Sequence, residues 1–136
     1  MILFLRVLFL VVLGTMLGVT GWASLHQPLG EFLRGGVIRD PWVIATLCDA
    51  YWGFIAFYVW AAWKEQSLAA RVLWLVALLA LGNIAIAAYM LDELFTVSAR
   101  EPAGEALQKV FARRNPGGLI LPGALVALSV AVYWFA

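Results

Sequence analysis

Apolar residues run along this chain in long blocks that are separated by short polar segments. A helix that crosses the hydrocarbon core of a membrane needs about 20 mostly apolar residues. Four stretches meet that requirement, at residues 2–25, 42–63, 70–91 and 119–136. Because backbone polar groups in hydrocarbon must be satisfied within their own segment, each stretch is expected to be a helix. The pattern therefore predicts an all-α protein, a single domain folded as an integral membrane four-helix bundle.

The polar segments between these stretches mark the helix boundaries. Asp40 followed by Pro41 is typical of an N-cap and first helical position, and Ser67 is a typical N-cap. The second stretch is separated from the third by a connection whose polar part is only residues 64–67 (KEQS). Since so short a connection joins antiparallel neighbours, these two helices are predicted to form a tight hairpin.

The longer segment between the third and fourth stretches contains a short amphipathic pattern. Ala103, Leu107, Val110 and Phe111 fall on one helical face, and charged or amide side chains fall elsewhere. Pro102 suits the first turn of such a helix, and residues 115–118 (NPGG) end it. The helix is expected either to lie along lipid headgroups or to pack against neighbouring protein.

Composition supports the membrane interpretation and removes several classes of function. The chain has 136 residues, of which 65% are hydrophobic and 12% charged, whereas soluble domains are about half apolar and about a quarter charged. One Cys and one His are too few for a disulfide framework or a multi-histidine metal site, so no metal is expected. The net charge of +1 gives no reason to expect nucleic acid as a partner.

Asp49 is the ionisable residue that lies deepest in a predicted span. It lies about seven residues into the second stretch, where a charge costs about 2.5 to 3.5 kcal/mol. Folding the predicted hairpin places Asp49 beside Asn83, so we expect a cross-helix hydrogen bond between them, with Tyr89 and Trp52 as further donors nearby. These residues form the expected polar site, which serves either as structural hydrogen bonding or as a place to hold a proton or ligand.

Small and aromatic residues indicate contact surfaces. Gly14 and Gly18 form a GxxxG pattern extended by Gly21, and Gly82 gives the third stretch a small surface. Such faces let helix backbones approach closely, within one chain or between chains. Aromatic residues within the spans are compatible with contact to a lipid, a quinone or a pigment, although the sequence calls for no cofactor.

Charged residues give an expected orientation. With four spans, both termini share one side with Arg6, Lys64 and Arg71, while the other six Lys and Arg residues lie opposite. The excess of positive charge in cytoplasmic loops then places both termini outside the cytoplasm.

Several short aromatic strings carry a family resemblance. They are WASL at residues 22–25, RDPW at 39–42, TLCDAYWGF at 46–54 and WKE at 63–65. In these the chain resembles a family of short multi-span proteins from bacteria and plants that is known as a domain of unknown function. The resemblance covers roughly the first two stretches and implies no reaction.

The chain lacks the residue combinations that support catalysis. It has no Ser-His-Asp set, no two-histidine site and no glycine-rich phosphate loop, so no catalytic residue is expected. The sequence therefore predicts a non-catalytic accessory or assembly subunit of a larger membrane complex, for example a respiratory or photosynthetic one, with lipids and other membrane subunits as partners. The alternatives are a ligand-binding or proton-coupled transport module that uses Asp49, and an isoprenoid-type membrane enzyme with Asp49 as the acid.

Overall fold

A computed structural model describes residues 1–135, and this part of the chain is all α-helical. Ala136, the last residue of the predicted fourth stretch, lies outside the described residues. The elements are α1 (Ile2–His26), α2 (Leu29–Arg34), the 3-10 helix η1 (Gly36–Arg39), α3 (Pro41–Lys64), α4 (Leu68–Leu81), α5 (Asn83–Phe95), α6 (Ala103–Ala112) and α7 (Ile120–Phe135). The predicted fold class is thus confirmed at the level of secondary structure.

Two of these helices, α1 and α3, are long and apolar enough to cross a membrane. They have 25 and 24 residues, which correspond to about 36 Å of helix each at about 1.5 Å per residue. The helices α4 and α7 are apolar but shorter. The described residues therefore hold two candidate spans, and the four-span bundle that the sequence predicts is not confirmed.

The predicted helix caps and hairpin are present. Asp40 Oδ1 accepts a hydrogen bond from Trp42 N at 2.8 Å, and Ser67 Oγ accepts one from Ala70 N at 3.4 Å. Two tyrosines of α3 tie it to α4, because Tyr58 and Tyr51 each donate to a backbone carbonyl of α4 at 3.2 Å. The short connection after Lys64 therefore forms the antiparallel pair that the sequence predicts.

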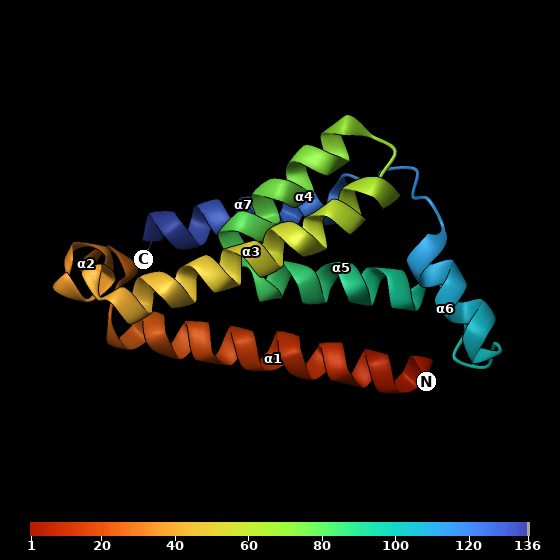
Figure 1. Cartoon of the computed structure of the whole chain (residues 1–136), viewed down its shortest axis with the longest axis horizontal. Helices are drawn as coiled ribbons and strands as arrows, with labels where there is room; N and C mark the ends of the chain where they lie inside the picture. The colour runs from red at the N-terminus through yellow and green to blue at the C-terminus, as the bar shows by residue number, and fades with distance from the viewer. Residues whose placement is uncertain (136) are drawn as a thin grey trace.

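The predicted third span is interrupted at Gly82. Its φ of +52° lies in the region that favours glycine, and a Cβ there would stand 2.6 Å from Cζ of Phe54. The chain reverses at this residue, so α5 runs back beside α4 (Figure 1) and the rings of Trp74 and Tyr89 lie 4.7 Å apart. The expectation of one continuous helix over residues 70–91 is wrong, because a backbone turn takes the place of a helical residue.

This reversal also changes where the chain ends lie. The N-terminus and the C-terminal end of α7 are at opposite ends of the molecule (Figure 1). The end that holds the N-terminus also holds the α3–α4 connection and α6. The expectation that both termini share one side is therefore not confirmed, because α4 and α5 together make a hairpin rather than one continuous helix.

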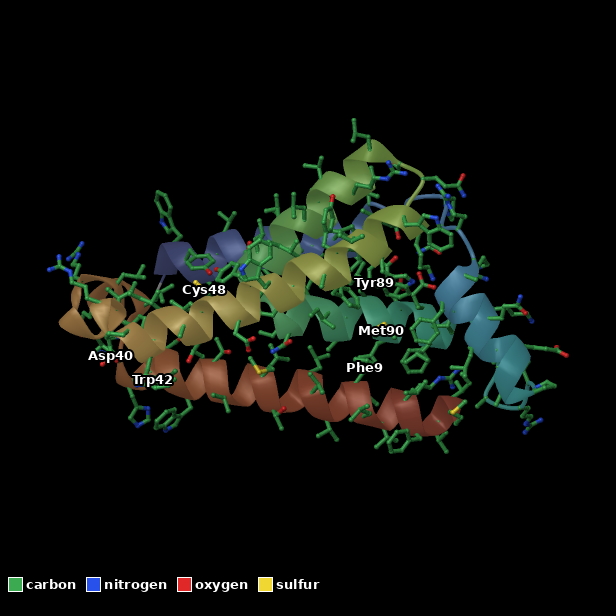
Figure 2. The ribbon with its side chains drawn as sticks, in the orientation of Figure 1. Phe9, Asp40, Trp42, Cys48, Tyr89 and Met90 are labelled. Atoms are coloured by element: carbon green, nitrogen blue, oxygen red, sulfur yellow. The ribbon has the colours of Figure 1, made fainter. Side chains whose placement is uncertain are left out.

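The helix α5 packs along the first half of α1 and supports α6. Ile2 and Leu94 are buried together with Val110 of α6, and Phe9 and Met90 lie in the space between α1 and α5 (Figure 2). The short amphipathic helix of the sequence is confirmed as α6, and its buried face packs against this chain.

Gly82→Ala is expected to lower the thermal unfolding midpoint of the purified protein. An alanine would be forced into an unfavourable backbone conformation and against the Phe54 ring, at a cost of about 1 to 3 kcal/mol. Gly53→Ala is the matched control, because a Cβ at Gly53 meets no atom within 4 Å. Equal midpoints for the Gly82 variant and the wild type would contradict the importance of this turn.

Candidate functional site

Five polar side chains gather where the end of α3, the middle of α5 and the segment before α7 meet. Lys64, Glu65 and Glu93 are at most 3% exposed, Tyr89 is equally buried, and Asn115 is half-buried. We call this set, Lys64, Glu65, Tyr89, Glu93 and Asn115, the polar cluster.

Lys64 and Glu93 form the ion pair of the polar cluster. The Nζ of Lys64 lies 2.7 Å from Oε2 of Glu93 and also donates a hydrogen bond to the carbonyl of Val110. The Trp60 ring lies 5.2 Å from the same nitrogen. A lysine with no exposed surface therefore has an acidic, a carbonyl and an aromatic partner, as a buried ammonium group requires.

Glu65 is held by hydrogen bonds alone. Its Oε1 accepts from Tyr89 Oη at 3.0 Å and from Asn115 Nδ2 at 2.8 Å. The same Asn115 amide also donates to Oε1 of Glu93. One side-chain amide thus links the two buried carboxylates, whereas only one of them has a lysine partner.

The backbone fixes Asn115 in this position. Asn115 N donates to the Lys64 carbonyl at 2.8 Å, and Gln66 N donates to the Asn115 carbonyl at 3.1 Å. The Arg71 side chain braces the same connection, because its Nε donates to the Glu65 carbonyl at 2.8 Å. The segment before α7 is therefore joined to the α3–α4 connection as a short two-stranded contact.

Aromatic rings surround Tyr89 on the inner side of the polar cluster. Phe57, Trp60 and Trp74 all contact its ring, with centroids 4.7 to 5.7 Å away in edge-to-face arrangements. Trp60 also donates from Nε1 to the Phe111 carbonyl at 3.0 Å. This shell excludes water from one side of the carboxylates, which strengthens the electrostatic interactions there.

A cavity of about 490 Å³ adjoins the polar cluster. Its walls include Glu65, Glu93, Asn115, Trp74 and the start of α7. Asp92 also lines it, and burial together with the charges of Glu93 and Glu65 raises the pKa of the Asp92 carboxyl. Negative charge is therefore concentrated around this space. Within residues 1–135, no group of three His, Cys, Asp or Glu side chains has the arrangement of a metal site.

The predicted pairing of Asp49 with Asn83 does not occur. Both side chains are exposed, and no hydrogen bond of the described residues joins them. The register of the hairpin is close to the expected one, since Tyr51 bonds to the Leu79 carbonyl. However, α4 ends at Leu81, and Asn83 is the first residue of α5 after the turn. Asn83 is therefore not part of the helix that pairs with α3.

The other predicted site residues are scattered. Trp52 is 69% exposed. Tyr89, which was predicted to lie near Asp49, is buried in the polar cluster instead. Gly14, Gly18 and Gly21 face open space, with no atom within 4 Å of an added Cβ. Of the four glycines, Gly82 alone makes a close contact within the chain, and that contact is to Phe54 at a turn.

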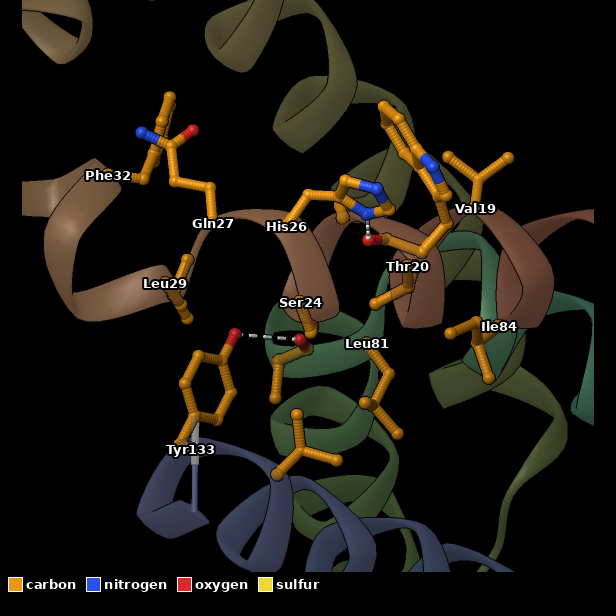
Figure 3. A pocket seen from close by; sticks show the side chains of 14 residues that line it. Val19, Thr20, Ser24, His26, Gln27, Leu29, Phe32, Leu81, Ile84 and Tyr133 are labelled. Carbon is orange, nitrogen blue, oxygen red and sulfur yellow. Dashed lines mark hydrogen bonds between the residues drawn. The ribbon is translucent and has the colours of Figure 1, made fainter.

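A second cavity lies near the opposite end of the molecule. It has a volume of about 570 Å³ and is lined by the last turns of α1, by α2, by the α4–α5 turn and by the end of α7 (Figure 3). Its walls are mostly apolar, and their polar members include Thr20, Ser24, His26, Gln27 and Tyr133. The Tyr133 hydroxyl already donates to the Ala80 carbonyl at 3.0 Å.

Sequence reasoning missed Lys64, Glu65, Glu93 and Asn115 as partners. Each lies in a polar segment between apolar stretches, and such residues are usually solvated. One signal was present: Lys64 and Glu65 stand in the shortest connection of the chain, where little space separates them from neighbouring helices. Their burial depends on the return of α5, which the apolar pattern did not reveal.

Comparison with family models gives one match, described as a protein of unknown function (DUF1475), over residues 1–116. The chain belongs to this family. The match confirms the resemblance to a domain of unknown function and covers every member of the polar cluster, whereas α7 lies beyond it. Neither the curated proteins nor the solved structures give a match for this DUF1475 member.

Lys64→Met is expected to destabilise this DUF1475 protein strongly. Removing the lysine leaves Glu93 buried without an ion-pair partner, which costs about 3 to 5 kcal/mol. Adding Glu93→Gln should recover most of the loss, because a neutral amide needs no counter-charge. Unfolding midpoints in detergent measure both effects.

The matched control for this double variant is the exposed pair Lys109–Glu101, whose charged atoms are also 2.7 Å apart. Lys109→Met should leave the midpoint almost unchanged, because solvent screens this pair. The prediction is contradicted if Lys109→Met lowers the unfolding midpoint as much as Lys64→Met does. It is also contradicted if adding Glu93→Gln to Lys64→Met does not raise the midpoint again.

Proposed function

We propose that this DUF1475 member is a non-catalytic integral membrane protein that packs against other membrane protein subunits as an accessory or assembly subunit. One observation carries the proposal: Asp49 lies in a helix long and apolar enough to cross a membrane, and its side chain is exposed. Ionisable residues within membrane helices almost always face protein or a water-filled cavity.

The position of Asp49 along α3 makes the cost of lipid exposure high. It is eight residues from Pro41, or about 12 Å along the helix axis. A charge at such depth costs about 2.5 to 3.5 kcal/mol on insertion scales. Since neither cavity is lined by Asp49, a partner from another chain is the group that would compensate for it.

The surface of α1 supports the same proposal. Outside its contact with α5, most of its apolar stretch is exposed, and Gly14 and Gly18 stand on it with open space in front of them. Glycines at this spacing allow a second membrane helix to approach the backbone closely. Two helices of the same molecule thus offer surfaces that suit protein neighbours.

Asp49→Leu is expected to abolish co-purification with the partner complex in gentle detergent, whereas Asp49→Asn should preserve it. The amide retains hydrogen bonding to a partner, and leucine does not. The measurement is quantitative mass spectrometry of the purified material. Ala69→Leu serves as the control, because it adds similar bulk at an exposed position of α4.

Other outcomes of this experiment would favour the other functions. Purification of the wild type alone, with a discrete lipid-like molecule bound, would replace the assembly function by ligand binding. Loss of a proton-coupled or acid-catalysed activity in Asp49→Asn, with partner association intact, would favour a transport module or an isoprenoid-type enzyme.

We further propose that the N-terminus lies in the cytoplasm and the C-terminus outside. In this arrangement α1, α3 and α7 cross the membrane, and the α4–α5 hairpin enters and returns on the cytoplasmic side. Of the nine Lys and Arg residues, only Arg34 and Arg39 belong to the end formed by α2 and η1. The remaining seven lie toward the end with the N-terminus and α6, and positive charge is enriched in cytoplasmic segments.

Cysteine labelling tests this orientation in a Cys48→Ser background. Glu105→Cys on α6 should react with a membrane-impermeant maleimide in inverted vesicles and not in intact cells, and Glu31→Cys on α2 should show the reverse. Both positions are exposed. Labelling of the two positions from the same side would contradict the arrangement.

A further inference from the structure

The cavity beside the polar cluster has a deficit of positive charge. Glu65 and Glu93 both line it, and each is at least 97% buried. Lys64 pairs with Glu93 alone, at 2.7 Å. Arg113 also lines the cavity and Arg71 lies behind the Glu65 backbone, but neither forms an ion pair with a carboxylate of the described residues. Of the two buried carboxylates, Glu93 therefore has an ammonium partner and Glu65 has none.

An acceptor atom is left over as well as charge. The buried Oε2 of Glu93 is already paired with Lys64 Nζ at 2.7 Å. Both hydrogen bonds to the Glu65 carboxylate end on Oε1, so its Oε2 retains its accepting capacity. Buried carboxylates of this kind are costly unless they are paired with charge and hydrogen-bonded.

We propose that this cavity binds a primary ammonium group, with Glu65 as its main carboxylate partner. An ammonium group supplies one positive charge and N–H donors, which match the missing charge and the free Oε2 of Glu65. Asp92 adds a third carboxylate at the wall, and Trp74 offers an aromatic surface to the cation. A quaternary ammonium carries the charge but no donor, so it fits less well.

The surroundings of the cavity suit an ammonium group that is carried beside a phosphate. Arg113 lines the cavity together with Leu119 and Ile120 at the beginning of α7, and Ile120 is almost fully exposed. A guanidinium is a good phosphate partner, and an exposed apolar helix start suits the depth of lipid headgroups. The same ammonium chemistry is found in an aminophospholipid headgroup and in a soluble amine such as ethanolamine.

Thermal unfolding in detergent tests the recognition of the ammonium group. Ethanolamine should raise the unfolding midpoint at constant ionic strength, and choline should not, because ligand that binds the folded state stabilises it by mass action. Glu65→Gln should raise the ethanolamine concentration for half the effect by at least about 10-fold, since a charge-assisted hydrogen bond is lost. Glu105→Gln, an exposed carboxylate on α6, should respond as the wild type does.

A comparison in nanodiscs identifies the source of the ammonium group. A higher midpoint in phosphatidylethanolamine than in phosphatidylcholine, lost in Glu65→Gln, supports a lipid headgroup as the ligand. Stabilisation by ethanolamine without a difference between these lipids supports a soluble amine. If Glu65→Gln fails to fold, Asp92→Asn at the exposed wall replaces it and should weaken the same response.

Two results would overturn the proposal. The first is a wild-type protein that responds equally to ethanolamine and choline and equally to the two lipids, which would mean that the cavity does not recognise a primary ammonium group. The second is a folded Glu65→Gln variant with the wild-type response to ethanolamine, which would place the amine elsewhere.

Discussion

The reversal of the chain at Gly82 is the constraint on which the arrangement of this protein depends. A residue with a side chain would meet the Phe54 ring and would resist the positive φ. Because α4 stops there and α5 returns beside it, residues that follow the turn come back to the level of the α3–α4 connection. Tyr89 and Glu93 reach Lys64 and Glu65 by this route.

Burial then gives these polar residues their physical importance. In a low-dielectric environment a carboxylate without a partner is costly, and each partner removed leaves another group unsatisfied. Asn115 joins the two carboxylates and also holds the backbone of the preceding connection. The segment between α6 and α7 is thus linked to the end of α3 by the same residue that organises the charges.

The apolar surfaces of α1 and α3 that this chain leaves exposed differ from the buried polar cluster in what they can bind. Within this chain, α5 covers one side of α1, and the glycines of α1 and Asp49 of α3 remain uncovered. The polar cluster is packed inside the molecule, whereas Asp49 is exposed on an apolar helix. The partners that we propose for them differ accordingly: a small cation in the cavity for the first, and a neighbouring membrane protein for the second.

The sequence by itself determined several of the helices and some of their ends. Apolar run length predicted α1 and α3, and local hydrogen-bonding chemistry predicted the caps at Asp40 and Ser67 and the amphipathic α6, because these features depend on residues close in sequence. Only the tertiary structure decided the polar cluster and the position of Asp49. An apolar stretch of this length has the same hydrophobic pattern whether it forms one membrane-crossing helix or two shorter helices in a hairpin. The hydrophobic pattern therefore could not place the reversal at Gly82. The membership in the DUF1475 family follows from the sequence, whereas the contacts of Glu65 and Glu93 follow from where α5 returns.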